Sequence, residues 1–120
     1  MPVYRQSGMA SKKEYLAFIL EQLSDLDEIS SRAMMGEYIL YYRGKVFGGI
    51  YDDRLLIKPV PAAVRKMPDA PMEVPYEGAK EMLLAEDVDN SGWLRALVES
   101  MWEELPEPKR KKKAAAGKQS

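Results

Sequence analysis

Carboxylates are the side chains best able to do chemistry in this chain of 120 residues, because it contains no histidine and no cysteine. Histidine is the commonest general base and cysteine supplies thiolate ligands, so catalysis or metal binding would depend on oxygen groups. The acidic candidates are the pair Asp52-Asp53 and the group Glu86, Asp87 and Asp89. Neither has the spacing of a calcium loop, and both are typical of turns or of helix caps, such as Asp89 or Asn90. We therefore expect no metal, no cofactor and no enzymatic activity.

A second set of side chains is suited to binding rather than catalysis, and it alternates along residues 37–58. Arg43-Gly44 and Asp52-Asp53 each predict a two-residue turn, which fixes the register of the strands around them. In that register Tyr42 faces Lys45, Leu40 faces Phe47, Tyr38 faces Gly49 and Tyr51 faces Arg54, and paired residues share a face. We expect one face, almost wholly aliphatic, to contact the helices: Ile39, Tyr41, Val46, Gly48, Ile50, Leu55 and Ile57. The opposite face carries Leu40, Leu56 and the candidate interaction residues, which are Tyr38, Tyr42, Lys45, Phe47, Tyr51, Arg54 and Lys58.

Three interpretations of the face with the candidate interaction residues remain open. Half-exposed tyrosines are ordinary strand residues. Tyr and Arg are also favoured at protein interfaces, so the face could bind a protein partner or a second copy of the chain. Aromatic rings beside Lys and Arg can instead stack on the bases of single-stranded nucleic acid. A β-bulge at Gly48-Gly49 would exchange the two faces beyond it.

Basic residues concentrate at the C-terminus. Residues 106–120 hold six basic residues and one acid, a net charge of +5, which leaves −6 on the remainder because the whole chain carries −1. We expect this segment to be a disordered basic tail. Its basic run would contact nucleic acid or an acidic surface, or would serve only as a solubilising end: Lys109, Arg110, Lys111, Lys112 and Lys113.

The chain also lacks membrane and export signals at the level of sequence. No apolar run approaches the roughly 20 residues of a membrane helix. The first residues do not follow a basic-then-apolar signal pattern. We expect a cytoplasmic protein without membrane contact.

The hydrophobic pattern predicts a single α+β domain over residues 11–105, preceded by a flexible extension of residues 1–10. Ser11 and Glu14 fit a capping box, so a helix is expected to begin at Ser11 and to end near Leu23. An antiparallel meander flanked by helices is the expected architecture. Its further elements are strands over 29–35, 37–42, 45–51 and 54–58, a short helix over 61–67, a strand over 81–85 and a helix over 93–105.

A series of residues in a fixed order extends over most of the chain: Tyr15-Leu16, Arg32, Met34-Met35-Gly36, Tyr38, Leu40, Gly44, Phe47-Gly48, Ile50, Asp53, Leu55, Lys58 and Pro75-Tyr76. In this order and spacing, residues 11–105 resemble the N-terminal domain of the TfoX/Sxy family of competence regulators. The resemblance implies an α-β-α-β-α order, with three or four strands before the middle helix and one or two after it. It also implies a fold of the secretion-chaperone type, in agreement with the pattern.

The same resemblance implies a role without catalysis. Family members activate natural-competence genes together with a cyclic-AMP-dependent transcription factor, and no catalytic residues are known in them. Those regulators carry a second, C-terminal domain, whereas only the basic tail follows Leu105 here. We expect a stand-alone interaction module that acts through protein contacts, with a transcription factor or a second copy as partner. Direct binding of nucleic acid, through the aromatic and basic face and the tail, is the alternative.

Overall fold

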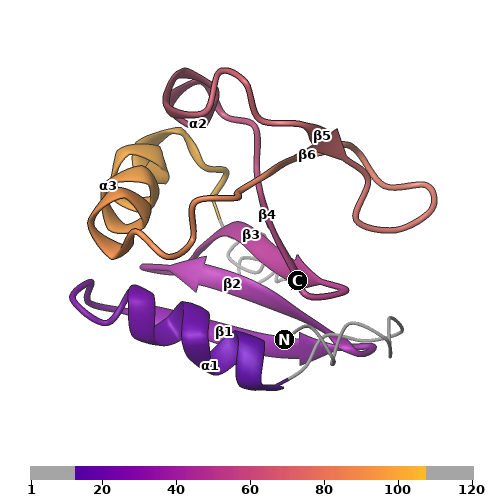
Figure 1. The fold of residues 1–120 in the computed structure, drawn as a ribbon, viewed down its shortest axis with the longest axis horizontal. Coiled ribbons are helices and arrows are strands. Elements are labelled where there is room, and N and C mark those ends of the chain that lie inside the picture. The colour runs from indigo at the N-terminus through magenta and orange to yellow at the C-terminus, as the bar shows by residue number, and fades with distance from the viewer. Residues whose placement is uncertain (1–12, 108–120) are drawn as a thin grey trace, which may run out of the picture.

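The computed structural model of the chain describes residues 13–107, and it shows three helices beside a six-stranded antiparallel sheet (Figure 1). The α+β class is therefore confirmed. The helices are α1 (Lys13–Gln22), α2 (Pro61–Lys66) and α3 (Ser91–Met101), which continues into a short 3₁₀ helix, Trp102–Glu104. The strands are β1 (Ile29–Met34), β2 (Glu37–Tyr42), β3 (Lys45–Tyr51), β4 (Arg54–Ile57), β5 (Met72–Glu73) and β6 (Met82–Leu84).

The elements follow the predicted order, with one strand added. The sequence did not predict β5, because it has only two residues and lies between Pro71 and Pro75, which gave no strand pattern. Three predicted features fall outside the described residues, namely the extension 1–10, the capping residue Ser11 and the basic run Lys109–Lys113.

Two-residue turns join the four strands of the meander. The sheet order is β1-β2-β3-β4-β6-β5. Met35-Gly36, Arg43-Gly44 and Asp52-Asp53 all have positive φ at both central residues, from 50° at Arg43 to 85° at Gly44. This is the backbone of primed hairpin turns, whose twist matches that of the flanking strands. The predicted pairs Tyr42 with Lys45 and Tyr51 with Arg54 are confirmed.

A β-bulge at Phe47 shifts the register between β2 and β3. Tyr41 pairs with Val46, but Leu40 pairs with Gly48, so Phe47 is an extra residue in β3. The predicted pairing of Leu40 with Phe47, and of Tyr38 with Gly49, is therefore wrong. Phe47 is buried in the core on the helix side of the sheet, because the inserted residue breaks the alternation of faces. Such a bulge was foreseen as an alternative, but one residue further along.

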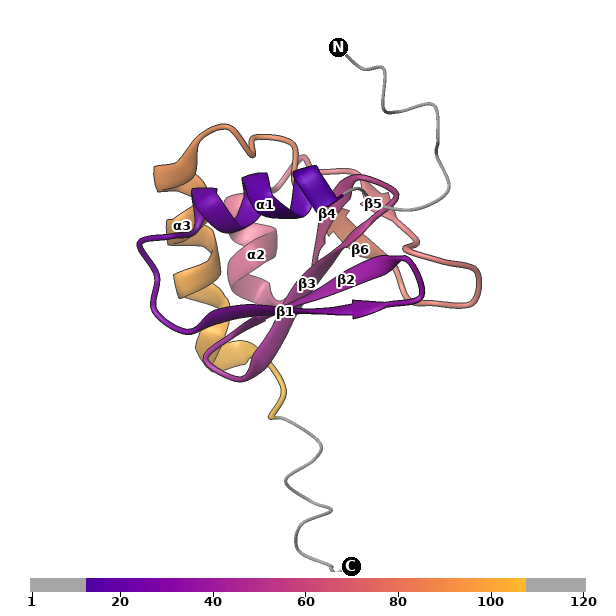
Figure 2. The ribbon, with the colours of Figure 1, turned by 90° about the horizontal axis from the view of Figure 1, so that it is seen from below.

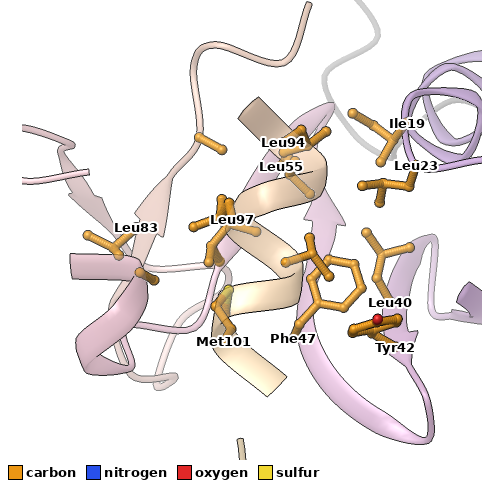
Figure 3. Close-up of a cluster of buried hydrophobic side chains, with 14 of the residues drawn as sticks. Ile19, Leu23, Leu40, Tyr42, Phe47, Leu55, Leu83, Leu94, Leu97 and Met101 are labelled. Atoms are coloured by element: carbon orange, nitrogen blue, oxygen red, sulfur yellow. The ribbon is translucent and has the colours of Figure 1, made fainter. Parts of the chain in front are cut away.

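The bulge decides which strand residues form the core. We call the helix-facing side of the sheet the inner face. Its buried hydrophobic members on β2, β3 and β4 are Leu40, Tyr42, Phe47, Ile50, Leu55 and Ile57. All three helices contribute buried residues to the same cluster, and they gather on one side of the meander (Figure 2). In Figure 3, Phe47 lies between α3 and the side chains of Leu40 and Tyr42.

Side chains also fix the helix ends. The Asn90 side chain accepts a hydrogen bond of 3.0 Å from the backbone N–H of Trp93, which confirms one of the two predicted caps of α3. Glu104 accepts a 2.8 Å bond from the N–H of Ala62 in the first turn of α2. The amide of Gln22 donates to the Val88 carbonyl at 2.7 Å, so the end of α1 is tied to the segment before α3.

Candidate functional site

The seven candidate interaction residues do not share a face, because the bulge divides them. Tyr38, Tyr42, Lys45 and Phe47 lie on the inner face, where the core is. Tyr51, Arg54 and Lys58 lie on the opposite side, since Tyr51 pairs with Arg54 and successive residues of β4 alternate. The expectation of one continuous aromatic and basic surface is therefore wrong.

Lys45, one of the four candidate residues on the inner face, makes its contacts within the fold. Its side chain is only 7% exposed, and its Nζ donates a 3.1 Å hydrogen bond to the Trp102 carbonyl. The Trp102 indole donates in turn to the Tyr42 carbonyl at 3.1 Å. Arg43 lies over the same indole ring, 4.9 Å from its centre. These contacts fasten the 3₁₀ helix to the β2–β3 hairpin, so Lys45 has a structural role here.

The opposite side of the meander, which we call the outer face, is mostly apolar. The expectation that Ile39, Tyr41 and Val46 would contact the helices is wrong for the same reason, since they point away from the core cluster. All three are half-buried. Each described helix contributes buried residues to the inner cluster instead. The outer face comprises Arg32, Met34, Glu37, Ile39, Tyr41, Val46, Gly49, Tyr51, Arg54 and Leu56, as the strand register assigns them.

The β5–β6 hairpin reaches one part of the outer face. The ring of Tyr76, in the β5–β6 loop, lies 6.3 Å from that of Tyr51. Arg54 forms an ion pair with Glu73 and donates a 3.1 Å bond from Nε to the Tyr51 carbonyl. A Cβ on Gly49 would lie 2.8 Å from the Tyr51 ring, so that ring covers the glycine. Burial, with smaller effects from Tyr76 and Glu37, raises the pKa of Tyr51.

Glu37 is the electrostatically unusual residue of the outer face. One of its carboxylate oxygens, Oε1, is buried without a hydrogen-bond partner. Burial raises the pKa of Glu37, the charge of Asp52 raises it further, and Arg54 lowers it in part. Arg54 is the nearby cation, and its side chain forms an ion pair with Glu73 and a hydrogen bond with the Tyr51 carbonyl. Sequence reasoning missed Glu37, Glu73 and Tyr76 as possible site residues, because only long-range contacts bring them together.

The predicted acidic candidates lie in connections. Asp52-Asp53 forms the β3–β4 turn, and Asp87–Asn90 forms the turn before α3. Among residues 13–107, no three acidic side chains come close enough together to hold a metal ion. Over the same residues, no helix has both the length and the apolar character that are needed to cross a lipid bilayer.

Comparison with known proteins gives two matches. The family model described as the TfoX N-terminal domain matches residues 21–105, from the end of α1 through the 3₁₀ helix. A protein of Spirochaeta aurantia, described as an uncharacterized 12.7 kDa protein in the trpE 5′ region, is 33% identical over 105 residues. The aligned part covers 87% of this chain and 91% of that protein. No solved structure matches.

Proposed function

Because the chain belongs to the TfoX N-terminal domain family, we propose that it is a non-enzymatic interaction module that acts through contacts with a protein partner. The TfoX/Sxy resemblance implies a partner from the machinery of transcription. In this proposal the module supplies a rigid binding surface and no reactive group.

The proposal is supported mainly by the apolar residues of the outer face. Ile39, Tyr41 and Val46 form a half-buried apolar row across β2 and β3 on the side away from the helices. Contiguous apolar surface of this kind is typical of protein contacts, and tyrosine is enriched in them. The absence of histidine and cysteine from the sequence agrees with a binding role.

Affinity capture tests this function with a matched pair of variants. The full chain serves as bait in an extract of its source cells. Tyr41→Lys places a charge on the outer face, and Val64→Lys places one on the exposed surface of α2. A partner captured by the wild type and by Val64→Lys, but lost with Tyr41→Lys, supports the proposal. Equal capture by both variants would contradict the assignment to this face, provided that both retain the wild-type near-UV circular dichroism.

A titration with single-stranded nucleic acid tests the alternative. Four of the seven candidate interaction residues contact the core, so the basic tail is the first part of the chain to test for this alternative. Phosphate contacts would give a log–log salt slope of about −0.7 for each contact on a single strand. We expect no binding at low salt by the chain that lacks residues 108–120. Steep, salt-sensitive binding by that shortened chain would favour nucleic acid over protein as the ligand of the domain.

A further inference from the structure

Three hairpin connections meet at one end of the sheet. The β1–β2, β3–β4 and β5–β6 connections all point to the same end of the molecule, at the right in Figures 1 and 2. Met34 pairs with Glu37, Glu37 affects the ionisation of Tyr51, and the Tyr51 ring contacts Tyr76. We call this end of the outer face the hairpin-tip surface and define it as Met34, Met35, Glu37, Tyr51, Asp52 and Tyr76.

The hairpin-tip surface exposes large apolar side chains. Met35 is 92% exposed, Tyr76 63% and Met34 46%. Met35 also stands at a φ of 52°, in the first central position of a primed turn. Asparagine, aspartate or glycine suits that position best. A methionine there gives the fold no buried contact, and flexible methionines are well adapted to partner surfaces of varied shape.

The same surface is acidic. Segments 34–37, 51–54 and 73–80 contain five acidic and two basic residues, a net charge of −3. Arg54, one of the two cations, is already paired with Glu73. The buried Oε1 of Glu37 has no hydrogen-bond donor within the part of the chain that is described. A carboxylate desolvated in this way is stabilised most by a cation brought from outside.

We propose that the hairpin-tip surface binds a protein segment in which a lysine or arginine is flanked by large apolar side chains. This inference rests on the proposed function, and it specifies the chemistry of the partner. The cation pairs with Glu37 and Asp52. The flanking apolar side chains contact Met34, Met35 and Tyr76, and the Tyr76 ring is open to a cation on its face.

Charge argues against the other occupants of this surface. A second copy would bring the same net negative charge to the contact, and like charges facing each other weaken association. Nucleic acid would bring phosphates to an acidic surface and would be repelled. Binding of a second copy is tested below by sedimentation, and binding of nucleic acid is tested by the titration described above.

Nuclear magnetic resonance with ¹⁵N-labelled full-length chain tests the proposal. Four synthetic peptides serve as probes: lysine among leucines, lysine among serines, glutamate among leucines, and glutamine among leucines. We expect shifts at residues 34–37, 51–54 and 74–77 with the lysine–leucine peptide, and binding at least about tenfold weaker with each of the others, the equivalent of about 1.4 kcal/mol. Equal binding of all four peptides, binding of none, or shifts located elsewhere would overturn the proposal.

Matched variants test the apolar contact and the charge contact separately. Met35→Asn removes the apolar side chain and suits the turn, and Glu37→Gln removes the charge with little change of shape. Each is expected to weaken binding of the lysine–leucine peptide by about tenfold. Val64→Gln and Glu99→Gln make the same kinds of change on α2 and α3, where both residues are exposed, and should leave binding unchanged.

The outcomes separate this inference from the proposed function. If no peptide binds while the capture experiment still yields a partner that depends on Tyr41, the module acts through proteins but not through the hairpin-tip surface. Self-association of the free chain in sedimentation, lost with Met35→Asn, would instead assign this surface to a second copy and overturn the inference.

Discussion

The ammonium of Lys45 lies 3.9 Å from the centre of the Trp102 ring and also donates to the carbonyl of the same residue. Glu107 lies 3.8 Å from that ammonium on its solvent side. A buried lysine is costly unless its hydrogen-bonding capacity is used. Here the contacts with Trp102 and Glu107 stabilise the charge, and the hydrogen bond joins the 3₁₀ helix to a hairpin 57 residues earlier.

Replacing Lys45 with methionine should lower stability. The variant keeps the apolar stem and loses the hydrogen bond and the cation–π contact, so we expect a loss of about 1–3 kcal/mol in the free energy of unfolding. Urea denaturation followed by tryptophan fluorescence measures it. Lys66→Met, at an exposed position on α2, is the control and should change stability little. Equal effects of the two substitutions would show that the Trp102 contact contributes nothing.

Phe47→Ala should be among the most damaging substitutions in the sheet. Phe47 is 0% exposed within the inner cluster, so its truncation leaves a cavity and costs about 3–5 kcal/mol. Tyr41→Ala, on the outer face, should cost about 1 kcal/mol or less. Thermal unfolding of both variants makes the comparison. Similar losses for the two would mean that Phe47 does not point into the core.

Gly48→Ala tests the close approach of β3 to β4 beside the bulge. A Cβ at Gly48 would overlap the Leu56 carbonyl oxygen and would lie 3.3 Å from the Ile57 Cα, both of them backbone atoms of β4. Backbone cannot yield as a flexible side chain can, so we expect a loss of at least about 2 kcal/mol.

Gly92→Ala is the matched control for that substitution. At Gly92, in the first turn of α3, the nearest atom to an added Cβ is 3.8 Å away. Alanine there should be neutral or should stabilise by up to about 1 kcal/mol. Chemical denaturation of the two alanine variants distinguishes them, and a tolerated Gly48→Ala would contradict the close approach of β3 and β4.

Glu37→Gln should change how stability depends on pH. Because burial and Asp52 raise the pKa of Glu37, the folded chain holds this proton more tightly than the unfolded chain. Stability therefore falls as pH rises from the ordinary glutamate value through the raised one. The glutamine variant should be more stable than the wild type at neutral pH, and its advantage should shrink on acidification. Urea midpoints over an acidic-to-neutral series measure this.

The control for that pH series is Glu99→Gln, at an exposed carboxylate on α3. It should follow the wild type at every pH. If Glu37→Gln also follows the wild type throughout, the Glu37 carboxylate is adequately solvated or paired in solution.

The strands and turns of the meander could be predicted because their signals are local. Arg43-Gly44 is a turn dipeptide, and the alternation on either side of it gave the bounds of β2 and β3. The face on which each side chain lies could not be predicted, because that assignment assumes that side chains alternate without interruption along each strand. The one inserted residue, Phe47, interrupts this alternation. Four of the seven candidate residues therefore lie on the inner face and three on the outer face.

The electrostatic features of the outer face were beyond sequence reasoning for a different reason. Glu37, Arg54 and Glu73 look like ordinary surface charges when taken one at a time. Only the folded chain shows that Arg54 selects Glu73 and leaves Glu37 with a buried, unpaired oxygen. Competition of two acids for one cation is a property of three-dimensional distance, and no spacing along the sequence encodes it.

The division of the core between early and late segments has a consequence for synthesis on the ribosome. The meander is local in sequence, whereas Leu97 and Met101, which belong to the same buried cluster as Phe47, come from α3 near the end of the described chain. At translation rates of about 5–20 residues per second, the part of the inner face that α3 covers stays uncovered for about 3–10 seconds after β3 has been made. During that interval the nascent chain leaves Leu40, Phe47 and Ile50 without their contacts to α3. Chaperone dependence should therefore be set by the time at which α3 leaves the exit tunnel.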